Sequence, residues 1–403
     1  SPSFQNFLKK RYDNNIEKLN EAWKEKHNSF DELETFLPSS AFVLRKRKDF
    51  TDWYVQKMSE WCERWAIWTR EYLKTCDIYQ SSGGWGFTEA GTDFTAQTKS
   101  MIKVDGGIRA TNEDESYILN FCITRMLSSA ARFYGIPFGT EPAGFATARG
   151  FVGRMYNVIV NNGAHFFSYH PNFLCNDQGV EKWVKYSSLL DRRAYPFIEV
   201  AVLYPDTMVK LEDSIIRYLD GSSFFTQVIS LRQHLDFDYC SEQMILDGVL
   251  KQYKVLVFLS RYHDGELMEH ESLEKIDQWV RSGGTVIYCC VHNHGICTVE
   301  GDYTIFNKWL TGDTGKGNVI ILNVDREPVG ISTTAIKQAL LSLDILDIKT
   351  KKMLTMQKSD LVYASILETG EFALLNFSYN PEQVLIEGME PVKMEPISIQ
   401  LVI

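Results

Sequence analysis

The sequence predicts an α/β protein: half of a (β/α)8 barrel, then a flavodoxin-like α/β layer, then a small antiparallel β domain. The main observation is that short strand-like segments alternate with helical segments in the first half of the chain. These strand-like segments are residues 76–82, 104–112, 136–142 and 164–171. Strand–helix–strand units of this kind pair their strands in parallel through right-handed crossovers. Four such strands make the C-terminal half of an eight-stranded barrel.

Each predicted strand runs into polar sequence or into sequence that contains Gly or Pro. A (β/α)8 barrel collects its active-site groups on the loops that follow its strands. We therefore expect a functional site at the carboxyl ends of these four strands. Residues 83–103 are rich in Gly and polar side chains, which predicts a loop over that site.

The residues ahead of the first strand, 3–74, have helical spacing. One long apolar stripe within them consists of Tyr54, Met58, Trp61, Cys62, Trp65, Trp68 and Tyr72. We expect this stripe to pack in the core and not to form a ligand platform. Aromatic side chains fill cores far more often than they line clefts.

The second half of the chain predicts two further units. Strands are expected at residues 198–205, 253–260, 282–290 and 317–324, with helices at 273–280 and 333–343. A Gly283–Gly284 pair ends a helix and leads into a buried strand, as in flavodoxin-like layers. From residue 347 onward apolar and polar residues alternate around a Thr369–Gly370 turn, which predicts antiparallel strands. The expected domains are residues 1–196, 197–346 and 347–403.

Composition excludes several classes of function. The formal net charge is −10, and the longest basic run is the four residues 45–48, so nucleic acid is not an expected partner. No apolar run is long enough to span a bilayer, so no membrane partner is expected either. The eight cysteines form no Cys-x-x-Cys pair, and free thiols mildly favour a reducing compartment such as the cytoplasm. The chain does not begin with Met, and we expect it to be part of a longer or processed protein.

Two motifs that could bind a cofactor fail on their spacing. Residues 311–318 lack the GxxxxGK[ST] spacing of a phosphate loop and predict a turn. Residues 288–297 hold three Cys and two His, but the adjacent Cys289 and Cys290 of a strand point to opposite faces. We therefore predict no metal site and no cofactor.

The stretch PFGTEPAG, residues 137–144, carries the main chemical signal. It places the carboxylate of Glu141 where an apolar strand breaks into a small-residue loop. A strand end can aim such a carboxylate rigidly at a reacting atom. The alternative is a solvated glutamate at a strand end, with no function.

In the order of its segments the chain resembles glycoside hydrolase family 42 β-galactosidases and their clan A relatives. The helical sequence FLKKRYDNNIEKLNEAWKEKHNSFDEL, residues 7–33, is similar to the segment after that family's acid/base glutamate. PFGTEPAG resembles its seventh-strand nucleophile segment, and NNGAHFFSYHP its eighth strand. RRAYPFIEVAVLYP is similar to the start of its α/β trimerisation domain, and the C-terminal residues to its β domain. The sequence KHN stands where that family usually has the aromatic sequence YWS, and FSYHP where it usually has a Trp-Arg pair. The resemblance therefore does not identify the sugar of the substrate.

The resemblance implies a retaining glycosidase, in which one carboxylate attacks the sugar and a second carboxyl group donates a proton. Glu141 would be the nucleophile. The proton donor would lie upstream of residue 1, so the chain is expected to lack it. Glu113 is an alternative within the chain, but it would lie on the strand next to Glu141; it fits better as a helix-start residue. Glu89 lies in the loop and is a weaker alternative.

Further residues near the predicted strand ends are candidates for binding a sugar, since indole stacks on sugar faces and polar side chains bind hydroxyl groups. They are Tyr79, Trp85, Asp105, Arg109, Asn112, Tyr169 and His170.

The sequence thus predicts a retaining exo-β-glycosidase for a terminal β-hexoside, a β-galactoside or a β-mannoside. Its expected partners are a small carbohydrate and, by resemblance, two further copies in a homotrimer. One alternative is a non-catalytic carbohydrate-binding or structural scaffold that lacks the acid. A glutamine-amidotransferase-like domain at 198–290 is a second alternative, but no Cys occupies its strand-to-helix elbow.

Overall fold

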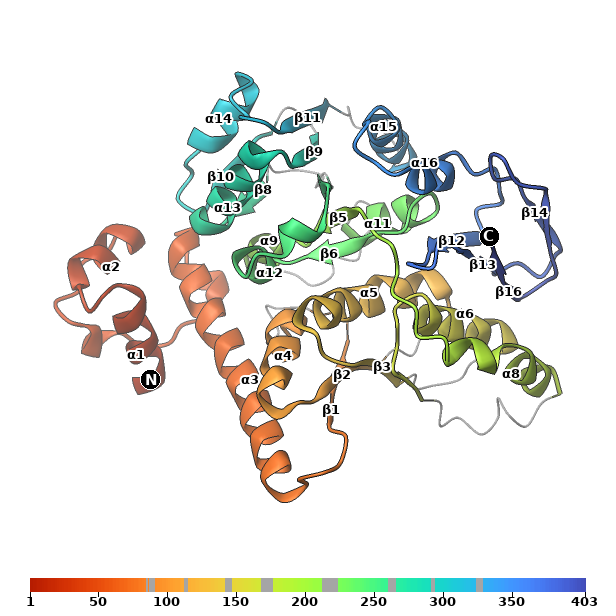
Figure 1. The fold of residues 1–403 in the computed structure, drawn as a ribbon. Helices are drawn as coiled ribbons and strands as arrows, with labels where there is room; N and C mark the ends of the chain where they lie inside the picture. Colours follow the sequence, from red (N-terminus) through yellow and green to blue (C-terminus); the bar gives the residue numbers. More distant parts are fainter. Residues whose placement is uncertain are drawn as a thin grey trace.

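In the computed structural model, an N-terminal helical segment is followed along the chain by three sheet-based units (Figure 1). It describes residues 1–84, 86, 91–111, 115–141, 147–167, 177–211, 224–259, 266–290, 294–323 and 329–403. None of the helices in these ranges is long and apolar enough to cross a lipid bilayer.

The N-terminal segment is helical, as predicted. Its elements are α1 (Pro2–Arg11), α2 (Ile16–Trp23), η1 (Phe30–Glu32), η2 (Pro38–Ser40) and α3 (Leu44–Tyr72). The side chain of Asn15 caps α2 by accepting hydrogen bonds from the backbone N–H groups of Glu17 and Lys18, at 2.9 and 3.3 Å. Trp23, at the end of α2, is buried and donates to Asp49 of α3 at 2.7 Å.

The predicted core packing of the aromatic stripe on α3 is wrong for the residues that the structure describes. Trp61, Trp65 and Trp68 are 51%, 62% and 42% exposed. The buried positions of α3 are instead Arg45, Lys48, Asp49, Thr51, Val55, Ser59 and Ala66. The physical reason is that α3 packs against α4, η4 and α9, and these contacts leave the three Trp side chains partly exposed.

The first sheet has four parallel strands in the order β1-β2-β3-β4, as the alternating pattern predicts. Its strands are β1 (Tyr79–Gly83), β2 (Gly107–Thr111), β3 (Phe138–Glu141) and β4 (His165–Phe166). The intervening helices are α4 (Phe94–Ser100), η4 (Met101–Val104), α5 (Tyr117–Tyr134) and α6 (Ala148–Ile159); α8 (Asp177–Leu190) follows β4. Within the described residues the sheet is open, with β1 and β4 as its edge strands.

The second unit is a five-stranded parallel sheet with the strand order β11-β9-β7-β5-β6. These strands are β5 (Val200–Leu203), β6 (Asp238–Cys240), β7 (Val255–Phe258), β9 (Thr285–Cys290) and β11 (Asn318–Asn323). Its helices are α9 (Asp206–Leu211), α11 (Phe224–Arg232), α12 (Glu242–Leu246), η5 (Val249–Gln252), α13 (His270–Ser282), α14 (Thr304–Leu310) and α15 (Val329–Leu341). A separate parallel pair is formed by β8 (Glu266–Met268) and β10 (Ile296–Thr298). The sequence pattern missed β6, β8 and β10, because three-residue strands are too short to show a period.

The third unit is antiparallel, as predicted. Strands β12 (Val362–Ile366), β13 (Phe372–Asn376) and β16 (Ser398–Val402) form one sheet, and β14 (Glu382–Val384) pairs with β15 (Val392–Met394). Gly370 has a φ of +92° in the turn between β12 and β13, a conformation that favours glycine. The residues just after 347 are helical instead, as α16 (Ile348–Thr355), since Asp347 caps them through Lys349 N–H at 2.8 Å.

Helix α5 joins the first unit to the second. It packs against β2 and β3 on one side and against β6 and α11 on the other (Figure 1). Its Arg125 is fully buried and donates to Asp236 at 2.7 and 3.0 Å. Although burial raises the pKa of Asp236, the guanidinium groups of Arg125 and Arg232 hold it below its ordinary value. Asp236 is therefore a buried carboxylate that depends on its two arginines.

Replacing Asp236 by Asn should remove about 3–5 kcal/mol from the free energy of unfolding, because it leaves buried guanidinium groups uncompensated. Urea unfolding at neutral pH measures the change. Asp313→Asn, which breaks an exposed pair with Arg281, is the matched control and should have little effect. Equal losses in the two variants would contradict this account of the buried cluster.

Candidate functional site

The carboxyl ends of the first sheet's strands lie side by side. Gly83 pairs with Thr111, and Thr111 pairs with Glu141, so the last residues of β1, β2 and β3 are in register. On the next strand, Thr140 pairs with Phe166. The predicted nucleophile thus stands in the middle of the edge on which barrel-type proteins carry their sites.

One face of this sheet is apolar and the other is polar. Ile108, Ala110 and Phe138 lie on the face that packs against the helices, and all three are buried. The positions between them carry Ser81, Arg109 and His165 on the opposite face, which we call the open face. The open face is partly accessible to solvent within the described residues.

Arg109 is the central charged group of the open face. Its Nε donates to Ser81 Oγ at 2.7 Å, and its guanidinium carbon lies 5.9 Å from the centre of the Phe167 ring. Arg109 pairs with Gly139, two residues before Glu141, so alternation assigns positions 109, 139 and 141 to one face. Gly139 has a steric reason to be glycine: a Cβ there would lie 2.7 Å from the Cβ of His165.

Two predicted site residues lie at the opposite, amino edge of the sheet. Tyr79 begins β1, and its ring centre lies 5.1 Å from that of His165 across the open face. Asp105 lies in the turn before β2, with a left-handed φ of +48° and its carbonyl bonded to Arg70 at 3.1 Å. The structure therefore brings Arg109 near position 141 but does not bring Asp105 there.

Other predicted residues lie outside the described ranges: Trp85, Glu89, Asn112, Glu113, Tyr169 and His170. For Glu141 the structure describes the backbone position at the end of β3.

Ser81 and His165 were missed by the sequence reasoning, although both lie on the open face. Alternation along β3 puts position 139 on the same face as position 141, and the strand pairing of the structure then puts Ser81 and His165 on that face. Glu115 was missed as well: its carboxylate accepts from the backbone N–H of Thr147 at 3.2 Å and from the Thr147 hydroxyl group. Thr147 caps α6 through Gly150 N–H. Glu115 thus helps to hold the start of α6 in place.

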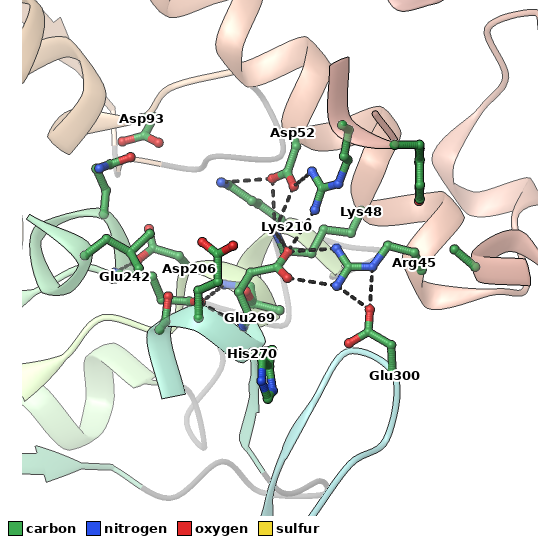
Figure 2. Close-up of a pocket in the computed structure, with 18 residues that line it drawn as sticks. Arg45, Lys48, Asp52, Asp93, Asp206, Lys210, Glu242, Glu269, His270 and Glu300 are labelled. Carbon is green, nitrogen blue, oxygen red and sulfur yellow. Dashed lines mark hydrogen bonds and ion pairs between the residues drawn. The ribbon is translucent and has the colours of Figure 1, made fainter. Parts of the chain in front are cut away.

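A separate charged cleft of about 710 Å³ lies between the N-terminal helices and the second unit (Figure 2). One wall is an ion-pair network centred on Glu269, just before α13. Arg45 contacts its carboxylate at 2.8 and 2.9 Å, and Lys48 at 2.7 Å. Lys48 and Lys210 also pair with Asp52, at 2.8 and 3.1 Å. This network ties α3 to the second unit.

The other wall of the cleft is acidic. Glu242 accepts from the N–H groups of Thr207 and Glu269, both at 3.0 Å, and Asp206 accepts from Glu242 N–H at 2.6 Å. Burial, together with the nearby carboxylates of Asp93 and Glu242, raises the pKa of Asp206 to about 8, against the opposing effect of Lys210. Asp206 is therefore largely protonated at neutral pH.

In the part of the chain that the structure describes, no group of three or more His, Cys, Asp or Glu side chains is arranged to hold a metal ion. In Figure 2 dashed lines link Arg45 and Lys48 to Glu269, and Lys210 to Asp52. These ion pairs connect α3 to the second unit across the cleft.

Comparison with solved structures gives the class of fold: over its whole length the chain is similar to glycoside hydrolase family 42 proteins. No protein-family model matches the sequence. No curated protein matches it either.

Three solved structures illustrate the likeness. A catalytic mutant of Gan42B, a GH42 β-galactosidase from G. stearothermophilus, aligns with a TM-score of 0.71 and 13% identity, over 100% of this chain and 75% of that one. The β-galactosidase from Rahnella sp. R3 gives 0.71 and 12%, over 99% and 74%. The exo-carrageenase GH42 from Bacteroides ovatus gives 0.63 and 11%, over 99% and 62%. At these identities the comparison establishes the fold.

Asp206→Asn should stabilise the protein at high pH. An unfolded aspartate has a pKa near 3.9, so the folded state with its raised pKa binds the proton more tightly, and stability falls as pH rises from about 4 to 8. Asn cannot ionise and escapes this loss. Because one pKa unit corresponds to about 1.4 kcal/mol, we expect a gain of a few kcal/mol at pH 8 and little gain at pH 4.

Urea unfolding of both proteins at the two pH values measures this difference. Asp31→Asn, at an exposed ion pair with Lys9, serves as the control and should show no such pH-dependent gain. A variant that is equally destabilised at both pH values would contradict the assignment.

Proposed function

We propose that this chain carries the nucleophile half of a retaining exo-β-glycosidase that hydrolyses a terminal β-hexoside, a β-galactoside or a β-mannoside. The observation that carries the proposal is the position of Glu141, at the carboxyl end of a central parallel strand and in register with Thr111. The fold shared with family 42 enzymes supports it, since one of those structures is a catalytic mutant in which glutamate is replaced by alanine.

In the proposed reaction the Glu141 carboxylate attacks the anomeric carbon of the sugar. The bond to the leaving oxygen breaks as a proton donor supplies its proton, and a covalent glycosyl–enzyme ester forms. Water then attacks the anomeric carbon, and the deprotonated donor group takes the water's proton. The sugar is released with its original configuration, and the carboxylate of Glu141 is regenerated.

Arg109 is proposed to bind a hydroxyl group of the sugar. It lies on the open face opposite Gly139, two residues before position 141. Ser81, which accepts a hydrogen bond from Arg109, holds the guanidinium in place. His165 would form the floor beneath the sugar, supported by the ring of Tyr79, which packs against it from the amino edge of the sheet.

The proton donor is proposed to lie outside residues 1–403, as the resemblance implies. Among the described residues near the strand ends, Asp93 and Glu115 carry carboxylates. Asp93 accepts from Ala96 N–H at 2.9 Å as the cap of α4, and Glu115 is bonded to Thr147. Both are thus used to fix helix starts.

We also propose roles for the other two units. Residues 197–346 would form a flavodoxin-like layer, since its strand order, with β5 counted as the first strand, is the 2-1-3-4-5 order of flavodoxin-like sheets. By resemblance this layer would mediate trimer formation, with the β domain at residues 347–403 packed beside it.

Glu141 can be tested as the nucleophile with 2,4-dinitrophenyl 2-deoxy-2-fluoroglycosides of galactose and mannose. Their leaving group needs little acid assistance, so a covalent ester should form even without the donor. We expect a single sugar on the peptide that contains residue 141, found by mass spectrometry after proteolysis. Glu141→Gln should abolish this label and lower turnover on the order of 10⁴-fold.

Glu113→Gln is the control and should leave the label in place. A sugar found on another peptide, or no label from either reagent, would overturn the role of Glu141.

Glu115→Ala should slow the reaction without moving the labelled residue. Loss of the bond to Thr147 releases the start of α6, the helix that follows β3 in the chain, and a misplacement near 1 Å costs about 100-fold in rate. The measurement is the rate of labelling at saturating reagent. The control Glu63→Ala breaks a surface pair with Lys103 and should label normally; an unchanged rate for Glu115→Ala would exclude a positioning role.

A further inference from the structure

The charged cleft between the N-terminal helices and the second unit contains more acidic side chains than basic ones. Seven carboxyl groups line it, against four basic groups. Each basic group is already paired with Asp52 or Glu269 at 2.7 to 3.1 Å; the four are Arg11, Arg45, Lys48 and Lys210. A cleft lined by an excess of one sign of charge attracts ligands of the opposite sign.

The excess lies on the acidic wall. In Figure 2, Asp93, Asp206 and Glu242 lie on one side of the cleft, and Arg45 and Glu300 lie on the other. Both carboxylate oxygens of Glu242 accept backbone N–H groups, so Glu242 has no free acceptor of this kind. Asp93 uses one oxygen to cap α4, and it has no basic partner within the described residues.

Asp206 is the group on this wall that points to a ligand. Its side chain is buried, at 7% exposure, and lines the cleft. Its Oδ2 accepts from Glu242 N–H at 2.6 Å, while its Oδ1 has no hydrogen-bond partner in the part of the chain that the structure describes. Buried polar atoms are nearly always hydrogen-bonded. The free oxygen of Asp206 is therefore an acceptor that a molecule in the cleft can use.

The cleft also lies where parallel sheets bind ligands. Asp206 follows the carboxyl end of β5, at Leu203, and Glu242 follows the carboxyl end of β6, at Cys240. In the sheet, β5 has β6 on one side and β7 on the other, so the direction of the strand order reverses at β5. Open α/β sheets bind ligands in the crevice outside the carboxyl ends of their strands at such a reversal.

We propose that this cleft binds an organic cation with primary amino groups, an alkyl diamine or polyamine, whose ammonium group contacts Asp93 and Asp206. Leu246 and Ala22, which also line the cleft, would pack against its methylene chain. The cleft volume of about 710 Å³ lies within the range of roughly 300–1,000 Å³ that is typical of small-molecule sites. The inference goes beyond the proposed glycosidase function, since none of the open-face residues lines this cleft.

Other classes of ligand match the cleft less well. An anion would need a free basic group, and all four are paired. A metal ion would need a cluster of ligating side chains, which the described residues do not provide. A sugar ring would need an aromatic face to stack on. The aromatic ring of Tyr12 is buried, and His270 is paired with Glu274 at 3.1 Å.

Binding of a cation should release a proton from Asp206. Asp93 and Glu242 keep this carboxyl group protonated at neutral pH, and Lys210 opposes them. An ammonium group beside Asp206 favours its ionised form, so the proton passes to the buffer. Further charged groups lie on the elements packed against α9, and their ion pairs are unchanged by the ligand; they are Arg47, Lys48 and Asp52 of α3, and Glu266 and Glu269 at β8.

Isothermal titration of the protein with putrescine, at constant ionic strength, tests the proposal. Titrations in two buffers with different enthalpies of ionisation give the number of protons released. We expect saturable binding with release of nearly one proton at pH 7. The affinity should rise by up to about tenfold per pH unit below pH 8, where Asp206 titrates, and level off above it.

Asp206→Asn should weaken binding at pH 8 by about 10- to 100-fold and abolish the proton release, because it removes a charged hydrogen-bond acceptor. Asp93→Asn should also weaken binding, and it preserves the fold because Asn caps a helix as well as Asp does. The matched control is Asp344→Asn, which makes the same change in net charge at a fully exposed residue outside the cleft and should bind normally.

Three outcomes would overturn the proposal: no saturable binding of putrescine, equal affinity in Asp206→Asn and the unchanged protein, or binding at pH 7 without proton release. Displacement of putrescine by Mg²⁺ at matched ionic strength would also overturn it, in favour of an inorganic cation. The fluorosugar label on Glu141 is measured separately. Loss of that label would overturn the glycosidase proposal and leave the cation site standing, and the reverse result would do the opposite.

Discussion

The three sheet-based units of this protein depend on one buried guanidinium group. Arg232 lies at the end of α11 in the second unit and is 1% exposed. It donates to the hydroxyl group of Tyr117 in the first unit at 2.9 Å, and to the carbonyl of Ala364 and the hydroxyl group of Ser365 in the third, at 2.7 and 3.0 Å. Because separating the units would leave this buried guanidinium without these three acceptors, their separation carries a large desolvation cost.

The hydrogen bond from Arg232 to Tyr117 also supports the candidate site. Tyr117 begins α5, and α5 packs against β2 and β3, the two strands that end at Thr111 and Glu141. Precise positioning of a nucleophile requires such a rigid support. On the other side of the molecule, the network around Glu269 holds α3 against the second unit.

The sequence by itself determined the four parallel strands, the antiparallel C-terminal sheet and Glu141 at a strand end, because period-two and helical patterns and Gly or Pro breaks are local signals. It could not determine the three-residue strands β6, β8 and β10, nor that Asp105 lies at the wrong edge to join Glu141. It could not show that the aromatic stripe of α3 is exposed, since a stripe looks the same whether or not a neighbour covers it. Register, edge and burial partners are set by contacts between residues far apart in the chain, and only the tertiary structure decides them.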